Sequence, residues 1–116
     1  MTLKVLDCTT NLTKLADIKA AFVDAGIVAT EHYYANDYYI VTTTMFSFVI
    51  KIQSYHTTNK RIYVWIGTAY GSGTNILNPI NINVRGWDDC AANAAVIITP
   101  DIIAIADRRG SNVYTT

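Results

Sequence analysis

Two stretches of the chain, residues 45–53 and 61–69, place a large apolar side chain at every second position. In the first stretch these side chains belong to Phe46, Phe48, Ile50 and Ile52, and in the second to Ile62, Val64 and Ile66. Successive side chains of a β-strand point to opposite faces of a sheet, so this spacing predicts strands with one buried face. Such a face is stable only when a second layer of the protein covers it.

Turn-forming residues predict that these strands are joined as hairpins. Ala35, Asn36 and Asp37 stand between two runs of β-branched and aromatic residues, where they supply the turn of a first hairpin. Residues 41–51 (VTTTMFSFVIK) and 98–108 (ITPDIIAIADR) share a design: an apolar strand end, a threonine, a tight polar turn and an apolar strand closed by a cation. Both are therefore predicted as hairpins, and connections this short make the strands mostly antiparallel.

One segment near the N-terminus has the periodicity of a helix instead. Its apolar side chains recur at intervals of three and four residues, and they are Leu12, Leu15, Ile18, Phe22 and Ala25. Asn11 offers a side-chain oxygen to the free amides of a first turn, and Gly26 stands where helices commonly end in a left-handed residue. The pattern predicts a helix over residues 11–25 with one apolar face.

Together these elements predict a single α+β domain over residues 1–116, a length that supports one hydrophobic core. A strand candidate at residues 3–7 precedes the helix, and further strands follow it. We expect a mostly antiparallel sheet or sandwich of about seven to eight strands, with the helix packed on it. Residues 102–106 (IIAIA) are apolar on both faces, so their strand is either central in a sandwich or covered by another subunit.

The composition favours a protein that associates with other proteins. Hydrophobic residues make up 51% of the chain and charged residues 16%, and the formal net charge is zero. Low charge gives a small monomer little protection against association, so we expect other chains to cover part of the surface. The alternative is a neutral monomer with a large core. The lysines and arginines are scattered, which argues against nucleic-acid binding.

Neither a membrane segment nor a secretory signal is predicted. Residues 62–84 form the longest uncharged stretch, but glycines and a proline interrupt it. A helix that crosses a bilayer needs about 20 mostly apolar residues. The first residues, MTLKVLDC, carry a lysine and an aspartate where a secretory signal requires an apolar run.

The patterns that carry catalysis or metal binding are weak, and we predict no enzymatic activity, no cofactor and no metal. Glu31 and His32 are adjacent in a predicted strand, so they point to opposite faces and do not form an acid–base pair. The glycines on either side of Ser72 lack the spacing and the strand-to-helix context of a nucleophile elbow. Asp88 and Asp89 lack the alternating acidic pattern of a calcium loop.

Cys8 and Cys90 are the two cysteines of the chain. They lie far apart in the sequence, outside any CxxC pattern, and no histidine stands at metal-ligand spacing from them. This favours small buried hydrophobes, with a disulfide between them as the alternative.

Tyrosines indicate where another chain docks. Two tyrosine pairs flank the first predicted turn, and adjacent strand residues face opposite ways, so this hairpin shows tyrosine on both faces. Tyrosine is enriched in surfaces buried against a partner, although the same residues can also complete a small core. Met45 and Val49 join the candidate interface because they lie on the face opposite Phe46 and Phe48. The interface candidates are Tyr33, Tyr34, Tyr38, Tyr39, Met45 and Val49.

A second hypothesis is a small binding module for glycans or for a host protein. Sugars stack on exposed aromatic side chains beside carboxylates and amides, and the loops at residues 70–79 and 85–93 contain such groups. The candidate ligand-binding residues are Tyr70, Trp87, Asp88, Asp89 and Asn93.

Three stretches, residues 38–52, 61–80 and 94–110, are low-charge hairpins rich in threonine, asparagine and glycine that end in polar loops. In this the chain resembles small virion proteins of tailed bacteriophages, such as capsid decoration, neck, tail or baseplate components. The resemblance implies a non-enzymatic virion protein in many copies, bound to itself and to the major capsid or tail protein. We expect it to dock on these subunits through exposed strand edges and aromatic surface. It implies neither a nucleic-acid partner nor a membrane, and it transfers no functional residue. Outside a virion, the expected location is the cytoplasm.

Overall fold

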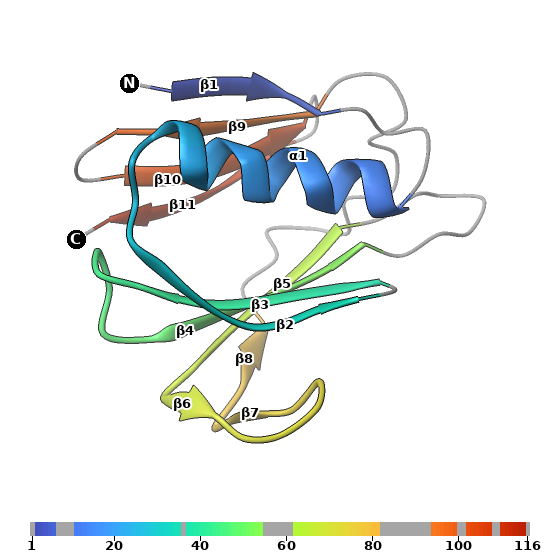
Figure 1. The fold of residues 1–116 in the computed structure, drawn as a ribbon, viewed down its shortest axis with the longest axis vertical. Helices are drawn as coiled ribbons and strands as arrows, with labels where there is room; N and C mark the ends of the chain where they lie inside the picture. The colour runs from blue at the N-terminus through green and yellow to red at the C-terminus, as the bar shows by residue number, and fades with distance from the viewer. Residues whose placement is uncertain are drawn as a thin grey trace.

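The computed structural model describes residues 2–6, 11–35, 37–54, 62–81, 94–99, 102–107 and 110–115. Within these ranges the chain forms one helix and eleven strands (Figure 1). In chain order they are β1 (Thr2–Val5), α1 (Asn11–Asp24), β2 (Ala29–Ala35), β3 (Tyr38–Thr43), β4 (Val49–Ser54), β5 (Ile62–Gly67), β6 (Ala69–Tyr70), β7 (Ile76–Leu77), β8 (Ile80–Asn81), β9 (Ala94–Ile98), β10 (Ile102–Asp107) and β11 (Gly110–Thr115).

The strands form two main sheets whose pairings are all antiparallel. One sheet has four strands in the order β1-β9-β10-β11, and the other has five in the order β2-β3-β4-β5-β8. The four-stranded sheet joins both ends of the chain, because β1 pairs with β9 in the register Leu3 to Ile97. The predicted α+β class is therefore confirmed, with the helix packed on antiparallel sheets (Figure 1).

The three predicted hairpins are confirmed. Ala35 pairs with Tyr38 across the first turn, and Thr42 pairs with Val49 across the second. In the third, the Thr99 amide donates a hydrogen bond to the Ile102 carbonyl at 2.8 Å. The neighbouring Pro100 and Asp101 lie outside the described residues.

Two local expectations need correction. The strand expected from residue 45 begins at Val49, so Phe46 and Phe48 belong to the turn before β4. Their rings stack at a centroid distance of 4.7 Å, and both side chains still pack on the core. Residues 70–79 were expected to form a loop but contain the β6–β7 hairpin. The C-terminal residues form the edge strand β11.

Helix α1 ends at a left-handed glycine, as predicted. Gly26 has φ of +72°, which is unstrained only for a residue without a Cβ. The Gly26 amide donates to the Val23 carbonyl, and the Ile27 amide donates to the Phe22 carbonyl. These two bonds form a Schellman motif, and Ile27 adds the apolar contact that commonly accompanies it. The chain can therefore turn directly from α1 toward β2.

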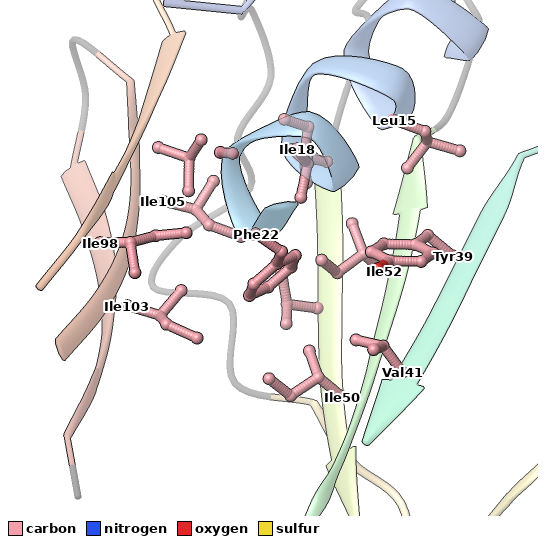
Figure 2. Close-up of a cluster of buried hydrophobic side chains, with 14 of the residues drawn as sticks. Leu15, Ile18, Phe22, Tyr39, Val41, Ile50, Ile52, Ile98, Ile103 and Ile105 are labelled. Carbon is pink, nitrogen blue, oxygen red and sulfur yellow. The ribbon is translucent and has the colours of Figure 1, made fainter. Parts of the chain in front are cut away.

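The core lies between the two sheets and is filled by one face of α1. Figure 2 shows Phe22 between isoleucines of β9 and β10 on one side and residues of β3 and β4 on the other. Phe22 and Tyr39 approach within 6.1 Å between ring centroids. The fully or almost fully buried side chains of this core include Leu15, Ile18, Phe22, Tyr39, Val41, Ile50, Ile52, Ile62, Val64, Val96, Ile98, Ile103 and Ile105.

A second, smaller core lies on the opposite side of the five-stranded sheet. There the β6–β7 hairpin folds back, away from the helix (Figure 1), and Ile76 covers Ile40 and Val49. Gly67 permits this close approach, because a Cβ at position 67 would lie 2.6 Å from the Leu77 carbonyl oxygen and 2.9 Å from Ile76 Cδ1. The hairpin is thus held against the sheet at a position where only glycine fits.

We predict that Gly67→Ala lowers the free energy of unfolding by about 1–3 kcal/mol, the usual cost of overpacking. The added methyl group must displace the β7 backbone from β5. Urea denaturation measures this loss. Ser72→Ala, at the exposed tip of the same hairpin, is the control and should change stability by less than about 0.5 kcal/mol. Equal stability of the parent and the Gly67→Ala variant would contradict the close contact.

Candidate functional site

The predicted interface tyrosines lie on two different sides of the five-stranded sheet. Tyr34 and Tyr39 face the core, where their rings meet edge to face at 5.7 Å. Tyr39 is only 2% exposed and offers no docking surface, whereas Tyr34 is half-buried and has Lys19 Nζ 4.3 Å from its ring centroid. Tyr33 and Tyr38 lie on the outer side, are half-buried, and contact each other edge to face at 6.4 Å. Burial therefore removes Tyr39 from the surface candidates, and Tyr33 and Tyr38 are the two that share the outer side of the sheet.

Val49 does not meet another chain, contrary to prediction. Its side chain is 1% exposed because Ile76 of the β6–β7 hairpin covers it. Met45 is half-buried and packs against the main core, although part of it lines a cavity of about 330 Å³ beside Gly26 and Thr99. The alternation of residues 45–53 correctly placed Val49 on the outer face of the five-stranded sheet, the face turned away from the main core. The β6–β7 hairpin of the same chain occupies that part of the face.

The open half of the outer face carries a group of aromatic rings. The register places Tyr38, Gln53 and Tyr63 in one row across β3, β4 and β5. A second row contains Ile40, Lys51 and Trp65. We call this surface the aromatic face and define it by Tyr33, Tyr38, Lys51, Gln53, Tyr63 and Trp65, all of which are half-buried. Tyr63 and Trp65 contact each other at 5.9 Å between centroids.

Lys51 lies at the centre of the aromatic face. Its Nζ is 5.1 Å from the centroid of the Tyr38 ring and 5.2 Å from that of the Trp65 ring. Both distances allow cation–π attraction, which holds the ammonium group over the rings. Burial there removes water from the ammonium group and lowers the pKa of Lys51. Among the residues that the structure describes, no carboxylate pairs with Lys51.

The β6–β7 hairpin bounds the aromatic face at one end. Tyr70 stacks on His32 at 4.6 Å with an interplanar angle of 9°, and the Tyr70 hydroxyl donates to the Gly73 carbonyl. His32 lies at a β-bulge of β2, and its Nε2 is 2.7 Å from Thr42 Oγ1. Of the predicted ligand-binding residues, Tyr70 therefore has one ring face occupied, and Trp87, Asp88, Asp89 and Asn93 lie outside the described residues.

The four-stranded sheet has an outer face of a different kind. Its part over β1, β9 and β10 consists of side chains that alternate with the buried ones, and we call this part, without β11, the apolar face. Its described members are Leu3, Val5, Ala95, Ile97, Ile102 and Ala104. Leu3 and Val5 are 59% and 67% exposed, and the other four are half-buried. Over these positions the face carries neither a charge nor a hydrogen-bonding side chain.

The described ranges contain no arrangement typical of catalysis. Glu31 pairs with Lys19 of α1, whereas His32 contacts Thr42, so the two adjacent groups are separated as predicted. No cluster of three potential metal ligands occurs among these residues. The described helix α1 lacks the length and apolarity needed to cross a bilayer. Cys8, His56 and Cys90 lie outside the described residues.

Comparison with protein-family models, with curated proteins and with solved structures gave no match to this chain.

We predict that Tyr39 makes stability fall in alkaline solution. Burial, with a smaller contribution from the Glu31 carboxylate, raises the pKa of Tyr39 from 10.0 to about 12 in the folded chain. The unfolded chain releases this proton at lower pH, so the stabilisation is complete below pH 10 and is lost as pH rises through about 12.

Denaturation at several pH values between 10 and 12 should show this loss, and Tyr39→Phe should reduce its slope. Tyr38→Phe is the matched control, since it keeps Tyr39 and therefore keeps the loss. An unchanged slope in Tyr39→Phe would show that Tyr39 does not ionise differently in the folded and unfolded chains.

Proposed function

We propose that the chain is a non-enzymatic assembly protein that docks on neighbouring protein subunits through its apolar face, first of all on a second copy of itself. The observation that carries the proposal is the exposure of Leu3 and Val5 on a sheet face without charge. Exposed apolar surface of this continuity typically marks a site of protein association. The low charge of the whole chain also favours association.

A second copy is the occupant that fits this face best. In a two-fold interface each residue meets the same surface patch of the partner, so a charged face would bring like charges together. The apolar face has no charged side chain among its described positions, and its half-buried alanines leave it flat enough for another sheet. Two sheets pack face to face at about 10 Å, as in a β-sandwich.

Docking through the face is favoured over docking through the edge strands β1 and β2. The edge strand β1 has four residues and carries Lys4, which reaches Asp17 of α1 at 3.9 Å. The edge strand β2 of the other sheet contains a bulge between Glu31 and Tyr33. Short edges, lysines and bulges all discourage pairing with a further strand.

A tailed-bacteriophage particle is the setting that we propose for this assembly. The resemblance to small virion proteins supports it, through the low-charge hairpins of residues 38–52, 61–80 and 94–110. In such a particle the chain would be present in many copies and would contact the major capsid or tail protein. The antiparallel sheets and the helix α1 are compatible with this role.

We predict that the chain associates reversibly and that Leu3→Glu abolishes the association. In the parent, light scattering at rising concentration should move from the 12.8 kDa of one chain toward twice that mass. A glutamate at position 3 would bury a carboxylate in the interface, whereas in the monomer it stays exposed and leaves the fold intact.

Val23→Glu is the matched control, because Val23 is 70% exposed on α1 and lies outside the apolar face. It should associate as the parent does. A parent that keeps the mass of one chain at every concentration, or a Leu3→Glu variant that associates normally, would contradict docking through this face.

A further inference from the structure

The aromatic face has the features of a ligand site and is separate from the apolar face, which belongs to the other sheet. Tyr38 and Tyr63 belong to β3 and β5, on either side of β4. Their backbones are therefore about 10 Å apart, because neighbouring strands are spaced by about 4.8 Å. The Gln53 side chain stands between them in the same row. Rings thus alternate with an amide along a line across the sheet.

Lys51 gives this surface a definite charge preference. It is the only charged side chain among the described outer-face positions of β2, β3, β4 and β5. No described carboxylate neutralises it, and the rings of Tyr38 and Trp65 fix its ammonium group. A partly desolvated cation of this kind gains most from an anionic partner that approaches from solvent.

We propose that the aromatic face binds an acidic saccharide, that is, a glycan that carries carboxylates on its pyranose rings. The C–H groups on one side of a pyranose ring stack on the faces of aromatic rings, as apolar groups do. Tyr38, Tyr63 and Trp65 offer such rings. The Gln53 amide donates and accepts hydrogen bonds with sugar hydroxyls, and Lys51 pairs with a carboxylate.

Nucleic acid fits this surface less well. Each nucleotide carries a phosphate, and affinity for a strand comes largely from several lysines or arginines that neutralise its phosphates. The described part of the aromatic face supplies a single cation. A saccharide with one carboxylate near Lys51 matches that single charge, and its hydroxyls match the phenol and amide groups around it.

A protein partner is the other occupant to be tested. Tyrosine and tryptophan also occur at protein interfaces, where the centre is depleted of charge. On the aromatic face, however, the cation lies in the middle, and polar groups alternate with rings. This arrangement favours a ligand in which apolar and polar groups alternate along the whole length, as they do in a saccharide.

Calorimetric titration of the intact chain with tetragalacturonate tests the proposal, and its fully methyl-esterified form is the uncharged match. A second arm uses 3′-sialyllactose and lactose, which shows whether a terminal carboxylate suffices. We expect the uronate to bind roughly ten- to hundred-fold more tightly than its methyl ester, because one hydrogen bond to a charged group contributes about that much. Sialyllactose should show the same preference over lactose if a terminal carboxylate is enough for binding.

Variants identify the residues responsible. Lys51→Gln should bind the acidic and the neutral forms equally, while Lys4→Gln, on the other sheet, should keep the preference of the parent. Tyr63→Ala should weaken binding of both forms, and it tests the stacking even if Lys51→Gln does not fold. Circular dichroism confirms that each variant is folded.

Three results would overturn the proposal: no saccharide binding at millimolar concentration, an unchanged preference in Lys51→Gln, or tighter binding of a thymidine oligonucleotide. None of them bears on self-association through the apolar face, so the two proposals fail independently.

Discussion

The packing of helix α1 between the two sheets is the contact on which the rest of the structure depends. Phe22 and Ile18 occupy the space between β9 and β10 on one side and β3 and β4 on the other (Figure 2). Each sheet buries its inner face there, and neither sheet could cover that face alone. The helix contacts β1, β4 and β9, so it joins the N-terminal strand to both layers.

One consequence is that the two outer faces are free to differ. The outer face of the five-stranded sheet carries aromatic rings, amide groups and Lys51. The β6–β7 hairpin covers one end of this face. In the four-stranded sheet, the described outward positions of β1, β9 and β10 carry only apolar side chains. We therefore interpret the molecule as a small two-sided module, in which one side assembles with other subunits and the other side meets a ligand.

Much of the fold was predictable from the sequence, because its signals are local. The period of two placed Ile50 and Ile52 inward, and the helical period found Leu15, Ile18 and Phe22. The candidate site was only partly predictable, because it depends on contacts between distant segments. Nothing near Val49 indicates that Ile76 covers it, and only the register of three strands brings Tyr38, Lys51 and Trp65 together. Lys14, outside the apolar stripe of α1, is nevertheless fully buried.

The most direct test of a two-sided molecule is the accessibility of Trp65 during self-association. A Trp87→Phe variant leaves Trp65 as the single tryptophan, and acrylamide quenching of its fluorescence can be measured while light scattering follows the mass. If the apolar face assembles and the aromatic face stays open, the quenching constant will be the same at the mass of one chain and at twice that mass. A marked fall in quenching as the mass doubles would show that the aromatic face is itself the interface.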